Sequence, residues 1–307
     1  MQSKRLAALD VGTNTVIFIV ADVGPAGVSV VYESSEITRL GEGSLEDHLL
    51  KKEPMARTIL AVSEAAQKAT ELGAEWAGAV ATSAVREASN GRAFSIMAQA
   101  VGAPLQVISG EQEADLSFLS VAFDKGAEQI AVLDIGGGST ELAVGTGLVP
   151  SGRFSLPIGA VRLTENHVRR HPLSREVLAE LRSDARRAFE RTPLPNGACT
   201  LFGVAGTITT LASVALALDK HDPELAHGYV FERAALETLI ESLARMPLEV
   251  REKLPGMEPK RADVIVAGGV IALEAMIHLK AEQLTASERG VHYGLLFSAA
   301  DEPSAPH

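Results

Sequence analysis

The sequence predicts an α/β protein of two similarly built domains with a cleft between them. Three observations predict this fold class: a length of 307 residues, an internal repeat, and strand-like segments that alternate with helical ones. This length is enough for two domains of ordinary size. We place the domains at residues 1–125 and 126–307, because each then contains one copy of the repeat near its start.

Each copy of the repeat consists of an apolar strand, an Asp, an aliphatic residue, a Gly and a turn with hydroxyl side chains. The first copy runs from Ala8 to Thr15 and the second from Val132 to Thr140. Both predict a β-hairpin with a turn of residues that tolerate positive φ. The backbone N–H groups of such a turn form a concave site for an anion such as phosphate. A single copy is explained equally well as a plain connector, but two copies with the same Asp favour phosphate binding.

Helical and strand-like patterns alternate between the two turns. Apolar residues at helical spacing predict a helix over 55–72. Short apolar runs predict strands over 77–81 and 105–108. Ser109 and Gln112 have the spacing of a capping box, which predicts that a second helix begins there.

The second half repeats this alternation. Apolar residues on one face predict helices over 174–190 and 234–245. Strands are predicted over 131–134, 142–145 and 200–204. The two halves therefore have the same general order of elements.

A third glycine-rich segment, 202–210, follows a predicted strand and leads into a helical stretch over 211–218. A helix N-terminus that begins with Gly and Thr is another anion site, although such turns are also common connectors. The phosphate-binding candidates of the three segments are Gly12, Thr13, Asn14, Thr15, Gly136, Gly137, Gly138, Ser139, Thr140, Gly206 and Thr207.

The composition and net charge of the chain limit the kinds of partner that the protein can bind. A formal net charge of −11 argues against nucleic acid and membrane surfaces, which are bound by positive fields. A polyanionic substrate would need a local basic site inside this acidic protein. The single cysteine, Cys199, and the lack of a long apolar run favour a cytoplasmic protein.

The three glycine-rich segments resemble the two phosphate motifs and the third glycine motif of the actin/sugar-kinase/Hsp70 superfamily. The segments between them are similar to those of the exopolyphosphatase and guanosine pentaphosphate phosphohydrolase (Ppx/GppA) family, in its short two-domain form. These segments are Thr38–Gly43, Ala81–Arg86, Ile108–Ala114, Leu156–Leu163, Leu254–Gly256, Arg261–Asp263 and Ser287–Gly290.

The resemblance implies a fold, a reaction and an assembly. The fold would be two ribonuclease H-like domains with an interdomain cleft. The reaction would be hydrolysis of terminal phosphoanhydride bonds of inorganic polyphosphate, or of a polyphosphorylated guanosine nucleotide. The resemblance also implies a homodimer.

Glu113 and Arg86 are the candidate catalytic residues. Glu113 lies in the first turn of the helix predicted from Ser109, where an acidic residue also complements the helix dipole. The resemblance implies that Glu113 activates the attacking water. Arg86 follows a predicted strand, and an arginine there can pair with two phosphate oxygens, although a lone loop arginine is usually solvated.

Asp10, Asp134 and Glu141 are the candidate ligands of Mg²⁺ or Mn²⁺. An Asp beside a phosphate site repels the substrate unless a cation lies between them. Asp134 and Glu141 flank the second turn on the two strands of one hairpin, so both could approach one ion. An exposed polar position on a strand is the alternative interpretation of Glu141.

The chain departs from the family pattern at Ile17, Asp115, His292 and Tyr293. These departures bear on chain-length preference more than on reaction type. Because a two-domain form has fewer surfaces to track a long polymer, we expect a preference for short polyphosphates. A small-molecule kinase of the same fold and a non-catalytic nucleotide-binding protein remain alternatives.

Overall fold

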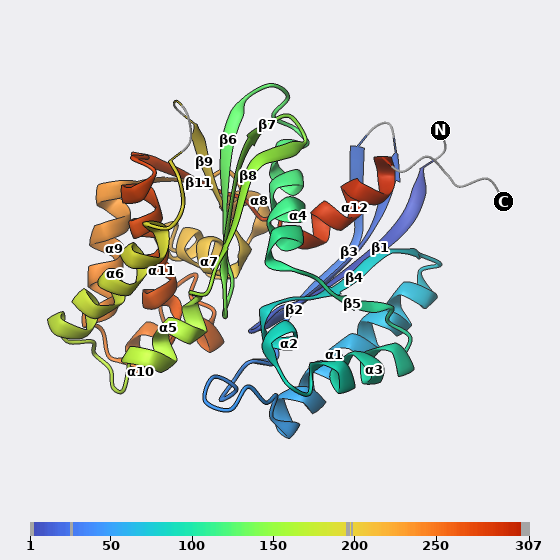
Figure 1. The fold of residues 1–307 in the computed structure, drawn as a ribbon, viewed down its shortest axis with the longest axis horizontal. Helices are drawn as coiled ribbons and strands as arrows, with labels where there is room; N and C mark the ends of the chain where they lie inside the picture. Colours follow the sequence, from blue (N-terminus) through green and yellow to red (C-terminus); the bar gives the residue numbers. More distant parts are fainter. Residues whose placement is uncertain (1–2, 25–26, 195–196, 198, 302–307) are drawn as a thin grey trace.

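A five-stranded sheet forms the centre of the first half of the chain (Figure 1). It belongs to a computed structural model that describes residues 3–24, 27–194, 197 and 199–301. The strand order is β3-β2-β1-β4-β5. The first three strands are antiparallel neighbours, whereas β4 lies parallel to β1 and β5 parallel to β4. Their bounds are β1 (Lys4–Val11), β2 (Thr15–Gly24), β3 (Gly27–Ile37), β4 (Glu75–Ala81) and β5 (Leu105–Val107).

The second sheet repeats this topology. Its order is β10-β11-β9-β6-β7-β8, in which β8-β7-β6-β9-β11 corresponds to the first sheet. The hairpin strands β6 to β8 are antiparallel, and β9 and β11 continue in parallel. The bounds are β6 (Gln129–Ile135), β7 (Thr140–Thr146), β8 (Val149–Leu156), β9 (Thr200–Val204), β10 (Val230–Glu232) and β11 (Gln283–Ala286). The predicted pair of similar α/β domains is confirmed.

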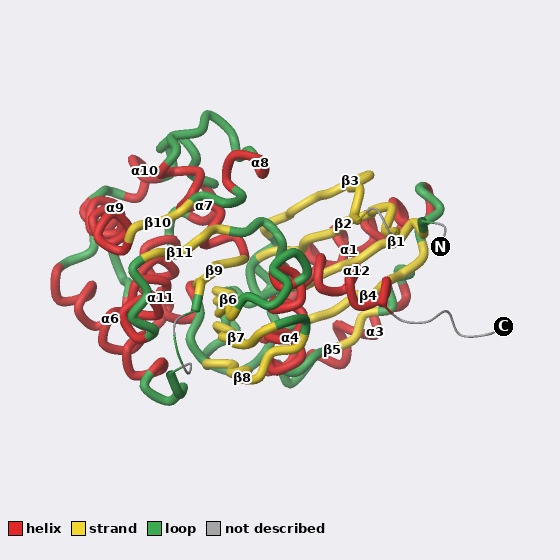
Figure 2. Tube along the Cα trace, turned by 90° about the horizontal axis from the view of Figure 1, so that it is seen from above, coloured by secondary structure: helices red, strands yellow, loops and turns green. Residues whose placement is uncertain are grey.

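Helices cover both faces of each sheet (Figures 1 and 2). The larger ones are α1 (Lys52–Glu71), α3 (Gly91–Ala100), α4 (Gly110–Ala122), α6 (Arg175–Phe189), α7 (Ala205–Ala215), α9 (Arg233–Arg245), α11 (Ile265–His278) and α12 (Val291–Asp301). Short ones are α2 (Ser83–Glu87), α5 (Ala160–His167), α8 (Pro223–Ala226) and α10 (Leu248–Arg251). Within the described residues, no helix is long and apolar enough to cross a membrane.

Side-chain alternation along β1 explains how one strand serves two cores. Leu9 and Val11 pack with α1 and α3 on one face of the first sheet. Leu6 and Ala8, at alternate positions of the same strand, pack on the opposite face with Leu295 and Leu296 of α12. β6 alternates in the same way between α4 on one face and the helices α6, α7 and α11 on the other.

Each half of the chain contributes one helix that packs on the sheet of the other half. α4 precedes the second sheet in sequence, yet its apolar side chains pack on β6, β7 and β9 of that sheet. α12 follows the second sheet, yet it packs on the back of the first. The two helices also contact each other closely: a Cβ on Gly294 would lie 2.2 Å from the carbonyl oxygen of Leu116. The domain division at residues 125 and 126 stays a prediction, because these helices pack across it.

Most predicted elements lie where the sequence puts them. The capping box at Ser109 is present, with the Ser109 side chain accepting from the Gln112 N–H and the Gln112 side chain accepting from the Ser109 N–H. One prediction differs in position: the helix expected from 211 already begins at Ala205. The third glycine-rich segment is therefore the end of β9 followed directly by the start of α7, with no loop between them.

Candidate active site

The two Asp–Gly turns have the same backbone geometry. Gly12 N–H donates to the Thr15 carbonyl at 2.9 Å, and Gly136 N–H donates to the Ser139 carbonyl at 3.0 Å. Each turn joins an antiparallel strand pair, β1 with β2 and β6 with β7. The duplicated turn is therefore a real structural repeat. It lies at the carboxyl end of the corresponding strand of each sheet, β1 in the first and β6 in the second.

The glycines of these turns serve close approach rather than positive φ. Neither Gly12 nor the glycines 136–138 has a positive φ, so these turns do not use the tolerance of their residues for positive φ. A Cβ on Gly138 would lie 2.5 Å from the Ser83 Oγ and 3.0 Å from the Thr13 Oγ1. The two loops face each other directly, and only the absence of side chains lets them come this close.

Glu113 and Arg86 meet at the end of β5. Arg86 Nη1 donates to Glu113 Oε2 at 3.1 Å and to the carbonyl oxygen of Ile108 at 2.9 Å. The Glu113 side chain is buried and borders the cavity between the loops. Arg86 is not among the residues that border this cavity, so it contacts the site through Glu113.

Four buried carboxyl groups come together from four elements: Asp10 of β1, Glu113 of α4, Asp134 of β6 and Glu141 of β7. Asp134 and Glu141 are direct cross-strand partners in the hairpin, as predicted. Asp134 accepts a hydrogen bond from the Ser117 hydroxyl of α4, and Glu141 accepts one from the Ser155 hydroxyl of β8 at 2.7 Å.

Burial raises the pKa of all four carboxyl groups, and repulsion from neighbouring carboxylates adds to this for Asp10, Glu113 and Glu141. Burial raises the pKa of Glu113 to about 7, the charge of Asp134 adds to this, and Arg86 opposes it. The pKa values of Asp10 and Glu141 are also raised well above the ordinary range, first by burial and then by neighbouring carboxylates. A carboxyl group with a pKa near 7 is suited to accept a proton at neutral pH.

The acid cluster has the donor set of a hard divalent cation. In the described part of the chain, Asp10 Oδ1 and Glu141 Oε2 are buried without a hydrogen-bond partner. Such orphaned oxygens are costly unless another group satisfies them. No three acidic, histidine or cysteine side chains among the described residues are close enough to hold a metal by themselves. This arrangement fits Mg²⁺, which uses one or two carboxylates and completes its shell with water and substrate phosphate oxygens.

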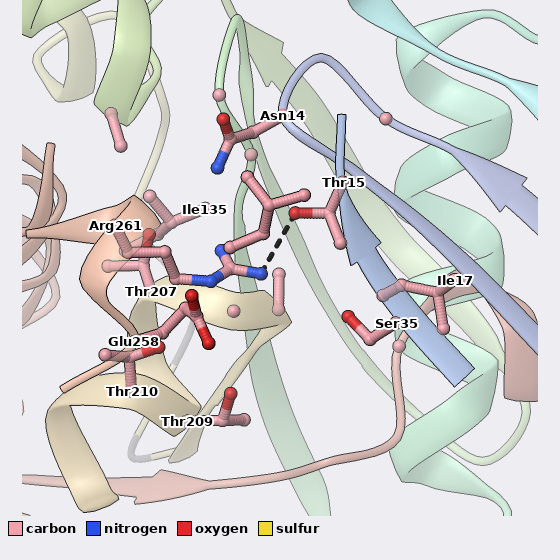
Figure 3. A pocket seen from close by; sticks show the side chains of 18 of the residues that line it. Asn14, Thr15, Ile17, Ser35, Ile135, Thr207, Thr209, Thr210, Glu258 and Arg261 are labelled. Atoms are coloured by element: carbon pink, nitrogen blue, oxygen red, sulfur yellow. Dashed lines mark hydrogen bonds between the residues drawn. The ribbon is translucent and has the colours of Figure 1, made fainter. Parts of the chain in front are cut away.

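A cavity of about 870 Å³ lies between the two sheets and is bordered by both loops and by the start of α7. Arg261 reaches into it from the second half of the chain and donates from Nη2 to the Thr15 hydroxyl at 2.9 Å (Figure 3). Its guanidinium lies against Gly206, where a Cβ would be 2.1 Å from Nη1. Burial lowers the pKa of Arg261 to about 10. Within the described residues Arg261 forms no ion pair, so it is a buried cation available to an anion.

Most of the predicted phosphate and metal candidates border this cavity. They are Asp10, Gly12, Thr13, Asn14, Thr15, Asp134, Gly136, Gly137, Gly138, Ser139, Gly206 and Thr207. Thr140 and Glu141 do not border it. The hydroxyl of the fully buried Thr140 donates to the Ile158 carbonyl at 2.6 Å, which indicates a structural role.

Sequence reasoning missed Arg261, although the string Arg261–Asp263 was noted. No local pattern distinguishes it from a solvated arginine, because its partner Thr15 is remote in sequence. Of the family departures, Ile17 and His292 border the cavity, whereas Asp115 pairs with Arg153 of β8 at 2.9 Å.

Two duplicated sheets that meet over three glycine-rich segments and a buried acid cluster define a two-domain α/β protein with a candidate phosphate site between its sheets. The model of the Ppx/GppA phosphatase family matches residues 19–302. Exopolyphosphatase 2 of Mycobacterium tuberculosis is 35% identical over 320 residues, which cover 98% of this chain and all of that relative. Exopolyphosphatase 1 of Mycobacterium leprae is 33% identical, with 97% of this chain and 90% of the relative covered.

A solved structure agrees with these relatives. The crystal structure of the Aquifex aeolicus member of the Ppx/GppA family matches with a TM-score of 0.83 at 31% identity, covering 96% of this chain and 97% of that one. The chain belongs to the Ppx/GppA phosphatase family, and it is an enzyme of the phosphoanhydride-hydrolase type.

Proposed function

We propose that the protein is an exopolyphosphatase that hydrolyses the terminal phosphoanhydride bond of inorganic polyphosphate and releases orthophosphate. The observation that carries this proposal is the buried, unpaired Arg261 facing the first phosphate loop, opposite an acid cluster that contains Glu113. Donors on one side and a base with a raised pKa on the other support hydrolysis of a phosphate anhydride rather than simple anion binding. The names of the relatives favour polyphosphate as the substrate.

In this proposal Glu113 orients a water molecule and takes its proton. The water oxygen bonds to the terminal phosphorus while the bridging P–O bond breaks, so the chain leaves shortened by one phosphate. Arg86 holds the Glu113 carboxylate in place through its hydrogen bond of 3.1 Å. The N–H groups of the glycine-rich loops and the Arg261 guanidinium bind the phosphate oxygens.

Mg²⁺ or Mn²⁺ fits the acid cluster, with one or two of the carboxylates of Asp10, Asp134 and Glu141 holding it directly and water completing its shell. When bound, the cation would neutralise phosphate charge and the charge of the cluster. The orphaned oxygens of Asp10 and Glu141 support this assignment. We also propose that the working protein is a cytoplasmic homodimer.

The alternative substrate is guanosine pentaphosphate, which presents a similar terminal anhydride to the same loops. Parallel phosphate-release assays on polyphosphate and on guanosine pentaphosphate, with Mg²⁺ and with a chelator, test the proposal. We expect release from polyphosphate at the higher kcat/KM, dependence on the cation, and no need for an organic acceptor. A preference for the nucleotide would assign the alternative substrate, and release only with an acceptor would indicate a kinase.

A further inference from the structure

We call the parts of the molecule built around the first and the second sheet the first and the second lobe. Arg261, the cationic side chain in the cavity, belongs to a short loop of the second lobe. The 3-10 turn Pro259–Arg261 places Arg261 in the cavity, and Asp263 follows it two residues later. Arg39, from the first lobe, spans the cleft to this loop. Its Nη1 and Nη2 donate to the two Asp263 carboxylate oxygens at 2.9 and 3.1 Å, and Nη2 also donates to the Lys260 carbonyl at 2.8 Å.

The backbone of Arg39 is fixed to the first phosphate loop. The N–H groups of Thr38 and Arg39 both donate to the Asn14 carbonyl, at 3.0 and 2.9 Å. Arg39 has a φ of 52°, in the left-handed region that a non-glycine residue adopts at a cost in energy. The surrounding contacts hold this conformation, and they direct the Arg39 side chain across the cleft.

Arg251, a residue of the second lobe, also binds this loop. This side chain is completely buried, and it donates to the Ala262 carbonyl at 2.8 Å and to the Leu243 carbonyl at 2.9 Å. The residue between Arg261 and Asp263 is therefore fixed within the second lobe. Arg39 adds the link to the first lobe, so the loop is held on both sides.

We propose that Arg39 and Asp263 form a positioning pair that keeps Arg261 ready for substrate phosphate. The pair ties the loop of Arg261 to the phosphate loop that contains Thr15, the hydrogen-bond partner of Arg261. This inference rests on the proposed function, because it assigns Arg261 to substrate phosphate.

Charge reversal and charge exchange test the pair. The variants are Arg39→Asp, Asp263→Arg and the double exchange, with Asp263→Asn as the milder change. We expect each reversal to raise the KM for a short polyphosphate by about tenfold or more while kcat changes by less than about threefold, because binding is weakened and the base is untouched. The double exchange should recover most of the KM, since the ion pair is restored with reversed polarity.

The chain offers a matched control within one lobe. Arg5 and Asp22 form a two-pronged pair at 2.8 and 2.9 Å, and its side chains have exposures of 40% and 35% against 32% and 27% for Arg39 and Asp263. Arg5→Asp makes the same change of charge as Arg39→Asp at a site outside the cleft. We expect the KM of Arg5→Asp to stay at the wild-type value. A rise in KM equal to that of Arg39→Asp would overturn the proposal.

A measurement without substrate separates this inference from the proposed function. Spin labels at Glu64→Cys of α1 and Ala235→Cys of α9, in a Cys199→Ser background, report the distance between the lobes. We expect each reversal to broaden the distance distribution and the exchange to narrow it again. Unchanged distances and KM in folded reversal variants, or an exchange without recovery, would overturn the positioning pair. Lack of phosphate release by the wild-type protein would overturn the proposed function, while the distances would still test the link.

Discussion

Glu113 lies between three other carboxyl groups and one arginine, and this setting makes its protonation state the central chemical variable of the site. Burial and Asp134 raise its pKa to about 7, and Arg86 limits the rise. The same position in the first turn of α4 would suit any acidic residue on dipole grounds, as the exposed Glu111 illustrates. What distinguishes Glu113 is its burial among acids at the edge of the cavity.

Glu113→Gln should lower kcat for phosphate release by about 10²–10⁴-fold, because the amide cannot accept the proton of water. Glutamine retains an oxygen for the Arg86 hydrogen bond, so the fold should be unchanged. Glu111→Gln, in the same helical turn but exposed, is the matched control and should retain full activity. Full activity of Glu113→Gln would mean that another group activates the water.

The raised pKa of Glu113 predicts an acidic limb in the pH profile. The base is active when deprotonated, so kcat/KM should fall about tenfold per pH unit below the pKa of Glu113, which is about 7 without a cation. Because a bound cation favours the ionised form, Mg²⁺ should move this limb to lower pH. A profile that is flat from pH 5 to 8 with and without the cation would contradict the role of Glu113.

The raised pKa of Glu113 also makes the stability of the folded protein depend on pH. A carboxyl group whose pKa rises from 4.5 to about 7 on folding binds more protons in the native state, so stability falls as pH increases through that window. The magnitude for Glu113 alone is about 3 kcal/mol. We expect the Tm without divalent cations to decrease between pH 5 and 8, and to decrease less in Glu113→Gln. An equal decrease in the variant would show that Glu113 does not carry this effect.

At the scale of elements, the two loops work because glycine lets them approach each other. Gly138→Ala places a methyl group 2.5 Å from the Ser83 Oγ and 3.0 Å from the Thr13 Oγ1, so the Ser83 side chain or a loop must shift. We expect kcat/KM to fall by at least about tenfold, since small displacements in a phosphate site are expensive. Gly152→Ala in β8 meets only ordinary contacts, 3.4 Å or longer, and serves as the control. Equal activity of the two variants would contradict the close loop contact as a requirement.

Local patterns predicted the elements but not the contacts between them. The capping box at Ser109 and the two hairpins depend on neighbouring residues, and their prediction was correct. The placement of α12 on the first sheet could not be predicted, because its apolar face has no local sign of which sheet it covers. Arg261 was missed for the same reason, since its contact with Thr15 joins opposite ends of the sequence.

At the scale of the whole molecule, the excess of acidic over basic residues predicts which polyphosphate chain lengths are hydrolysed more efficiently. Glu33, Glu36, Asp219, Glu258 and Glu288 border the cavity together with Lys220, Lys260 and Arg261. With a formal net charge of −11, the protein repels the part of a long polyanion that extends from the cleft. The basic residues of α6 do not offset this, because Arg182 and Arg186 pair with the buried Glu274.

We therefore expect kcat/KM at low salt to be higher for short polyphosphates than for long ones. Added salt should reduce the difference, because it screens repulsion beyond about 10 Å at 0.1 M. Initial rates on chains of defined length, at two ionic strengths, measure this preference. A preference for long chains at low salt would contradict the electrostatic account.

The central claim is that water held by Glu113 attacks the terminal phosphorus. Hydrolysis of a short polyphosphate in water enriched in ¹⁸O tests it most directly, with mass spectrometry of both products. The account predicts one ¹⁸O in each released orthophosphate and none in the shortened chain. Label in the shortened chain, or phosphate release only when an organic acceptor is added, would contradict it.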